Sequence, residues 1–166
     1  MILLSACLAG VPCRYDGASR GAPELMRLAL AGEAVLVCPE VLGGLPVPRC
    51  PSERQPDGSV KNRAGADVTA QYRLGAERAL AVCKARGCGC AVLKARSPAC
   101  GRGQIYDGSF SGRLIPGDGV LAAALLEAGI PVYTEEDCPA ALLQAGRPVC
   151  AGENEPAGPG RGEERP

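Results

Sequence analysis

Short apolar runs alternate along the chain with longer segments whose apolar residues recur at helical spacing. We predict buried β-strands at four of these runs, 1–6, 34–37, 91–93 and 130–133. We predict helices at 23–31, 65–86 and 119–128, and a last helix that Asp137 caps and that ends at Gln144. Strands that alternate with helices are typical of parallel βαβ units, so we expect a mainly parallel sheet with flanking helices.

Proline, glycine and aspartate mark the expected ends of these elements. Pro23 stands where a helix begins, Asp118 can cap the helix after it, and Gly87 and Gly129 are placed to stop helices. The stretch "CPEVLGGLPVPRCP", residues 38–51, is rich in proline and contains a glycine pair. We therefore expect it to be a stiff loop without regular helix.

The length of 166 residues suits one domain with a single core. The expected fold class is α/β, a single Rossmann-like domain of three layers that covers residues 1–146. Glycine, proline, glutamate and arginine dominate residues 147–166. We predict that this C-terminal tail is disordered.

The composition narrows the chemistry, because the chain has ten cysteines and no histidine. Without histidine, acid–base work near neutral pH falls to carboxylates, hydroxyls, lysine or cysteine. The N-terminus, "MILLSACLAG", lacks a basic segment, and no apolar run approaches membrane-spanning length. We therefore predict a cytoplasmic, reducing setting with no membrane partner, where many cysteines favour metal binding over disulfides.

The charges balance, with 18 basic and 18 acidic residues. A net charge of zero gives no overall field that would draw the chain to nucleic acid, and we do not expect a nucleic-acid partner.

Three cysteines follow the predicted strands. Cys7 and Cys38 come directly after the first two strands, and Cys100 lies in the loop after the third. Because the carboxyl ends of parallel strands meet at one edge of the sheet, these thiols are expected to converge there. The placement leaves an iron–sulfur cluster, zinc and no metal open as alternatives. Three thiolates on a four-iron cluster would leave one iron open to substrate, where it can act as a Lewis acid.

The other cysteines fall in less informative places. Cys13 and Cys50 lie further out in the same loops as Cys7 and Cys38. Three more are expected to be structural, because they lie inside a helix or before a strand at the opposite edge: Cys83, Cys88 and Cys90. Cys138 lies near a helix start, and Cys150 belongs to the tail.

Two residues beside these cysteines are candidate catalytic groups. Glu40 follows Cys38 by two positions, and Pro39 fixes the backbone between them. Glu40 is a general acid/base candidate, with a solvated carboxylate or an ion pair to Arg49 as the alternative. Ser97 precedes Cys100 by three positions and could cap a turn or donate a hydrogen bond in the site. The cations of these loops could hold an anionic substrate or cluster, or be solvated: Arg14, Arg49, Lys94 and Arg96.

Three motifs in order, "SACLAGVPCRYDG", "CPEVLGGLPVPRCPSE" and "LKARSPACG" followed by "GRGQIYDG", resemble the thiouracil desulfidase family, known as a domain of unknown function. The resemblance runs from Ile2 to Glu136. It implies a [4Fe-4S] cluster held by three cysteines, with the substrate sulfur on the fourth iron. The ligands carried over by motif are Cys7, Cys38 and Cys100, and the catalytic residues are Glu40 and Ser97.

The activity that the resemblance implies is a non-redox, hydrolase-type desulfuration. A thiouracil-type base, or its nucleotide such as 4-thiouridine monophosphate, reacts with water to give the oxo base and hydrogen sulfide. Some relatives carry an extra C-terminal domain and are similar in role to tRNA 4-thiouridine desulfidases. We expect no such domain here, and the chain has no strong basic excess, so we favour a small thiolated pyrimidine as the substrate. Two rival functions are a cysteine persulfide sulfurtransferase that uses Cys13 or Cys50, and a non-catalytic metal-binding module.

Overall fold

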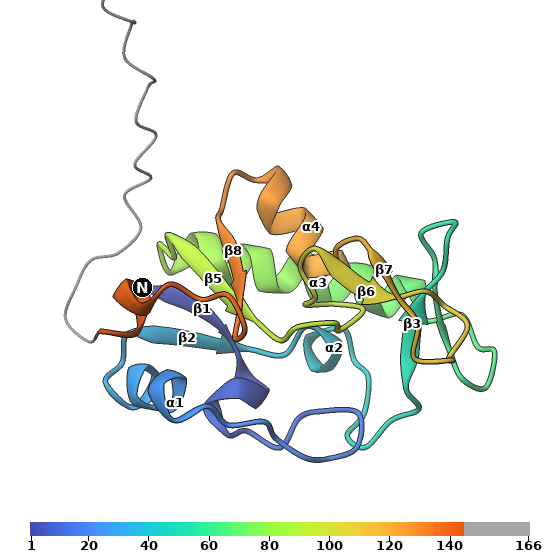
Figure 1. Cartoon of the computed structure of the whole chain (residues 1–166), viewed down its shortest axis with the longest axis horizontal. Coiled ribbons are helices and arrows are strands. Elements are labelled where there is room, and N and C mark those ends of the chain that lie inside the picture. The colour runs from blue at the N-terminus through green and yellow to red at the C-terminus, as the bar shows by residue number, and fades with distance from the viewer. Residues whose placement is uncertain (145–166) are drawn as a thin grey trace, which may run out of the picture.

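The computed structural model describes residues 1–144, and the predicted tail at 147–166 lies outside them. Its centre is a sheet of four strands in the order β2-β1-β5-β8 (Figure 1). The strands are β1 (Ile2–Ser5), β2 (Ala34–Val37), β5 (Cys90–Leu93) and β8 (Val132–Thr134). Every pairing in this sheet is parallel, which confirms the predicted α/β class.

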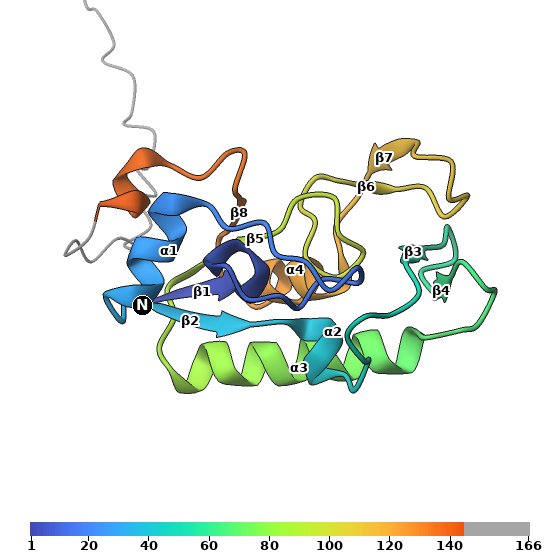
Figure 2. The ribbon, with the colours of Figure 1, turned by 90° about the horizontal axis from the view of Figure 1, so that it is seen from below.

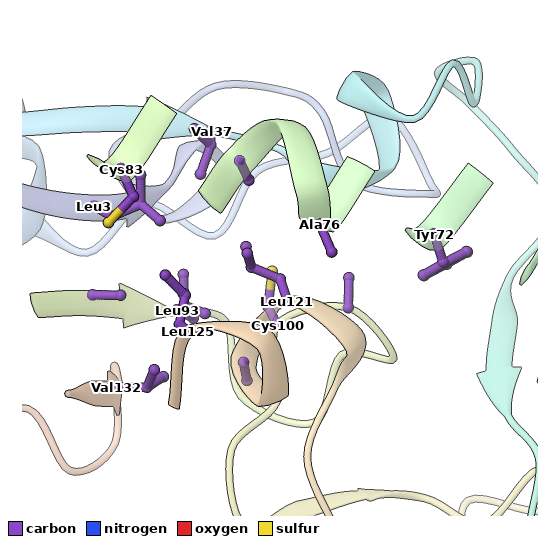
Figure 3. Packing of buried hydrophobic residues seen from close by; sticks show 14 of the residues in the cluster. Leu3, Val37, Tyr72, Ala76, Cys83, Leu93, Cys100, Leu121, Leu125 and Val132 are labelled. Carbon is purple, nitrogen blue, oxygen red and sulfur yellow. The ribbon is translucent and has the colours of Figure 1, made fainter. Parts of the chain in front are cut away.

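One face of the sheet carries the larger core. Strand side chains alternate between the faces, so Leu3 and Leu93 point to one side while Leu4 and Val92 point to the other. The first side packs against α3 (Thr69–Ala85) and α4 (Val120–Glu127). Figure 3 shows Leu121 of α4 in this layer beside Cys100.

The opposite face is covered by smaller elements. These are α1 (Pro23–Leu30) and two short 3-10 helices, η1 (Ala6–Ala9) and η2 (Ala140–Leu143). Leu25 and Leu28 of α1 and Leu142 of η2 pack there against the strands. Figure 2 shows α1 and α3 on opposite sides of the sheet, so the predicted three layers are confirmed.

Two antiparallel hairpins lie beyond the carboxyl ends of the strands (Figure 2). They pair β3 (Ser52–Arg54) with β4 (Val60–Asn62), and β6 (Gln104–Tyr106) with β7 (Leu114–Pro116). The sequence did not predict either hairpin, and α3 starts at Thr69 rather than residue 65. The hairpin strands have three residues each, too few for the alternation that identifies a half-buried strand, and most of them lack an apolar run of the kind that marks the central strands.

The stretch after β2 contains a helix, so the prediction of a loop without helix is wrong. Pro39–Leu42 forms the short helix α2, in which proline occupies the first helical position. Glycines make room for its close contact with α3. A Cβ at Gly75 would meet the Pro39 carbonyl oxygen at 1.8 Å, and one at Gly43 would meet that of Gln71 at 2.0 Å.

The predicted glycine stops at the helix ends are confirmed, but the two predicted aspartate N-caps are wrong. Gly87 and Gly129 follow α3 and α4 with positive φ angles of 61° and 75°. Asp118 does not cap α4, because its carboxylate accepts a hydrogen bond from the Gly103 amide instead. Asp137 accepts from the amide and hydroxyl of Thr134, and the predicted last helix is only the 3-10 turn η2.

Candidate active site

A cavity of about 740 Å³ opens at the carboxyl ends of the strands. This is where α/β folds bind their ligands, and the volume lies in the range of small-molecule sites. The structure places every predicted site residue in its wall: Cys7, Arg14, Cys38, Glu40, Arg49, Lys94, Arg96, Ser97 and Cys100.

Three strand ends bring the predicted cysteine ligands together. Cys7 lies in η1, directly after β1, and Cys38 is the N-cap residue of α2, directly after β2. Cys100 follows β5 by a short loop. Residues that are far apart in sequence therefore share one cavity because their strands are neighbours in the sheet.

Cys100 has the most buried surroundings of these thiols, with hydroxyl groups beside it. The Ser5 hydroxyl donates to its Sγ at 3.4 Å and accepts from the Lys94 amide at 3.0 Å. Ser97 Oγ accepts from the amides of Ala99 and Cys100, both at 3.2 Å, so Ser97 caps the turn that carries the cysteine. Burial raises the pKa of the Cys100 thiol to about 12.

Cys38 and Cys13 face each other in the same wall. The Cys38 thiol lies 3.7 Å from the Cys13 carbonyl oxygen, and the Cys13 side chain and burial both raise the pKa of Cys38. Cys13 itself is only 7% exposed and lines the cavity. It is therefore a fourth cysteine of the site, although its sequence position suggested a place further out.

Glu40 projects from α2 into a buried ion pair. Arg49 Nε donates to Glu40 Oε2 at 2.6 Å, and its other nitrogens donate to the carbonyl oxygens of Cys13 and Pro46. Desolvation opposes the charge of Arg49, but the carboxylate outweighs it and leaves the pKa of Arg49 raised. Burial and the same carboxylate raise the pKa of Tyr72, which lies against Glu40 at the base of the site. The arrangement matches the ion-pair alternative for Glu40.

The other predicted cations also have acidic partners. Lys94 Nζ pairs with Glu135, whose second oxygen accepts from the Ala95 amide at 2.8 Å. Arg14 pairs with Asp16, and Arg96 pairs with Glu136 nearer to solvent. Two more arginines line the cavity, Arg20 and Arg63, and neither has a carboxylate within 4.0 Å in residues 1–144.

The other cysteines of residues 1–144 lie outside the cavity wall. Cys83, a residue of α3, is completely buried in the core, and Cys88 and Cys90 are buried as well, in line with structural roles. Cys50 is exposed, and Cys138 is half-buried near η2. Cys150 lies outside the described residues.

No group of three or more His, Cys, Asp or Glu side chains within residues 1–144 could hold a single metal ion. Tetrahedral zinc needs its sulfur ligands at about 2.3 Å from one point. The cavity wall supplies thiol donors, which are the ligands of iron–sulfur clusters.

Sequence reasoning missed several residues of the wall. Glu135 follows the last strand run, as Cys7 and Cys38 follow theirs, so the same rule could have found it. Ser5 lies within a strand and Tyr72 within a helix, and no local signal distinguishes either from core. Glu53 and Phe110 come from the two unpredicted hairpin regions.

The fold and cavity define a class: a parallel α/β protein with cysteines from several strand ends and a buried carboxylate in one pocket. The family model described as 2-thiouracil desulfurase matches residues 2–137, most of the chain. The chain therefore belongs to the 2-thiouracil desulfurase family.

Two relatives are similar to this chain over most of its length. The chain is 40% identical over 146 residues to the uncharacterized protein YbbK of Bacillus subtilis (strain 168). The matched region covers 82% of this chain and 97% of YbbK. A solved structure of the [4Fe-4S]-dependent thiouracil desulfidase TudS is 47% identical. It superposes with a TM-score of 0.80 and covers 86% of this chain and 95% of its own.

Proposed function

We propose that this protein is a [4Fe-4S]-dependent thiouracil desulfidase that acts in the cytoplasm. The observation that carries the proposal is the convergence of Cys7, Cys38, Cys100 and Glu40 in one cavity of a chain in this family. The 47% identity to TudS extends over 86% of the chain, so it includes most of the fold that forms the cavity. No helix within residues 1–144 is long and apolar enough to cross a membrane.

The residues in the cavity fit an iron–sulfur cluster. The donors are thiols without histidine, as iron–sulfur clusters prefer. Ser5 supplies a hydroxyl donor to Cys100 Sγ, and hydrogen bonds to ligand sulfurs are a usual way to tune such clusters. Cys7, Cys38 and Cys100 would hold the cluster. When bound, it supplies an iron with an open position that acts as a Lewis acid toward the substrate sulfur.

The reaction needs no redox partner. Water adds its oxygen to the thiocarbonyl carbon, the carbon–sulfur bond breaks, and both protons of the water end on the sulfur as hydrogen sulfide. Proton transfer is therefore the work left to the side chains, and no histidine is available for it.

Glu40 is the proposed general acid/base. Its carboxylate lies in the cavity wall on the rigid first turn of α2, and Arg49 holds Oε2. Oε1 is the oxygen that we assign to the attacking water. Ser97 Oγ accepts hydrogen bonds from two backbone amides, and its own hydroxyl group can still act as a donor. We therefore assign Ser97 to hydrogen-bond the pyrimidine base of the substrate.

The experiment that tests this function is anaerobic. Protein reconstituted with iron and sulfide is given 4-thiouracil, and the loss of thiocarbonyl absorbance is followed together with sulfide release. We expect turnover by the wild-type protein and its loss in Glu40→Ala with the cluster retained. A stable cluster that turns over no thiolated base would refute the substrate assignment.

We further infer that a nucleotide such as 4-thiouridine monophosphate is a substrate. The cavity has more cationic than anionic side chains in a chain of zero net charge, and Arg20 and Arg63 are not engaged by carboxylates within residues 1–144. Such guanidinium groups are suited to bind a phosphate. Arg20→Ala should then raise KM for the nucleotide and leave KM for 4-thiouracil unchanged; equal effects on both would exclude Arg20 as a phosphate ligand.

A further inference from the structure

The few aromatic residues of the chain gather at the cavity. The sequence contains four tyrosines, one phenylalanine and no tryptophan. Four of these five residues line the cavity, and only Tyr133 lies elsewhere. The four are Tyr15, Tyr72, Tyr106 and Phe110. A chain that uses so few aromatic rings and places most of them in one pocket has a surface suited to a flat ring.

Phe110 is held in a backbone conformation that side chains rarely adopt. Its φ angle is 58°, and the only other non-glycine residue with positive φ within residues 1–144 is Arg96 at 61°. Both residues line the cavity. Such conformations cost free energy and persist where the surroundings impose them, often at binding sites.

Glu53 imposes this conformation from the other hairpin. Its Oε2 accepts hydrogen bonds from the amides of Gly108 and Phe110, both at 2.9 Å. Glu53 is only 8% exposed. Gln55 adds a hydrogen bond to the Gly108 carbonyl oxygen at 3.2 Å. A buried carboxylate that accepts two amides is a strong restraint, so the loop that presents Phe110 is fixed before any ligand arrives.

Arg63 lies beside the Phe110 ring on the cavity wall. Its guanidinium carbon is 5.7 Å from the ring centre, which is within the range of a cation–π contact. One face of the ring is therefore occupied by a flat cation, and the half-buried ring lines the cavity beside it.

We propose that Phe110 is a specificity-determining residue that stacks on the pyrimidine ring of the substrate, with Glu53 as the positioning residue. The inference rests on the proposed desulfidase function for the identity of the ring. Tyr72 is 1% exposed and lies in the core, so it cannot offer a face. Tyr15 is 43% exposed, pairs with Arg14, and lacks a comparable restraint on its backbone.

The test measures binding apart from turnover, on the cluster-loaded protein under anaerobic conditions. Calorimetry with uracil gives a Kd that does not depend on desulfuration, and 4-thiouracil gives KM and kcat. Phe110→Leu removes the ring and keeps an apolar side chain, and Phe110→Tyr keeps the ring. Tyr133→Leu is the matched control, because it removes the aromatic ring outside the cavity.

We expect Phe110→Leu to raise the uracil Kd and the KM by about 5- to 100-fold, the usual effect of losing one base–aromatic stack, with kcat little changed. Phe110→Tyr and Tyr133→Leu should bind uracil as the wild-type protein does. Glu53→Gln should raise the same Kd by a smaller factor, because it weakens the restraint and keeps the ring.

Uracil binding that is unchanged in Phe110→Leu would overturn the proposal, as would a loss found only in Tyr15→Leu. A wild-type protein that binds uracil but releases no sulfide would refute the desulfidase function and leave Phe110 to be decided by the Kd series. A wild-type protein that does not bind uracil would refute the stacking role itself.

Discussion

Arg49 Nε lies 2.6 Å from Glu40 Oε2, and the two side chains are 6% and 14% exposed. A carboxylate that is a general acid/base candidate is thus fixed by a guanidinium that also ties down two backbone carbonyl groups. Arg49 joins the short helix α2 to the loop that carries Cys13, so it orients both the Glu40 carboxylate and the Cys13 segment of the cavity wall.

Replacing Arg49 should reduce both activity and stability. Arg49→Met leaves a buried carboxylate without its partner, and such losses cost about 3 kcal/mol of unfolding free energy. We expect kcat to fall at least about 10-fold, since a misplaced acid/base loses much of its contribution. Urea unfolding and anaerobic turnover measure the two effects.

Arg102→Met is the control for this change. Arg102 pairs with Asp137 at 3.0 Å, but both side chains are more than 40% exposed, so the pair contributes little to stability. An Arg49→Met protein as active as Arg102→Met would contradict the positioning role.

The three predicted ligands should be necessary for the cluster. Cys7→Ala, Cys38→Ala and Cys100→Ala should each lose most of the bound iron and the visible absorbance after anaerobic reconstitution, because three thiolates are the fewest that the proposed site uses. Iron and sulfide analysis per chain measures the loss.

Cys13→Ala and Cys50→Ala distinguish the proposed cluster site from a persulfide mechanism that would use one of these two cysteines. Cys50 is exposed and outside the cavity wall, so Cys50→Ala should keep the cluster and full activity. Cys13→Ala should keep the iron content. Loss of the cluster in Cys13→Ala with retention in Cys7→Ala would assign the ligand role to Cys13, and metal-free activity would favour the persulfide mechanism.

A methyl group at Gly75 should separate α2 from α3. Its Cβ would lie 1.8 Å from the Pro39 carbonyl oxygen, which is backbone and cannot rotate away. We expect Gly75→Ala to lose at least about 2 kcal/mol of unfolding free energy, although alanine favours helix by about 1 kcal/mol over glycine. Arg73→Ala, an exposed position of the same helix, should be neutral in the same urea titration. A Gly75→Ala protein as stable as the wild type would show that α2 shifts freely.

The core beside Cys100 should be sensitive to truncation of its side chains. Leu121 is fully buried and lies next to Cys100 (Figure 3), so Leu121→Ala should cost about 2–5 kcal/mol. Leu30→Ala is the matched control, because Leu30 is 88% exposed and should change stability by less than about 0.5 kcal/mol. Similar denaturation midpoints for the two variants would contradict the packing described here.

The parts of the fold that the sequence predicted are those with a local signal. The run at 34–37 coincides with β2, and the strand-end rule correctly predicted that Cys7, Cys38 and Cys100 share one edge of the sheet. Runs of apolar residues and the direction of parallel strands contain that information by themselves.

The parts that the sequence did not predict depend on distant partners. Glu53 binds amides that lie 55 and 57 residues further along the chain, and no pattern near Glu53 indicates them. Asp118 has the spacing of a helix cap, yet the Gly103 amide is a competing donor. The hairpins, the shortened α3 and the Glu40–Arg49 geometry likewise follow from tertiary packing rather than local propensity.

The separation of the cysteines along the chain has a consequence for how the protein matures. The proposed ligands at positions 7, 38 and 100 become neighbours only after β1, β2 and β5 have paired, so under this proposal a partly synthesised chain that ends before Cys100 has no complete set of thiols to offer. Delivery of iron and sulfide must then follow folding, and the cavity has to remain accessible to whatever delivers them. A motif with closely spaced cysteines could be loaded while the rest of the chain is still being made.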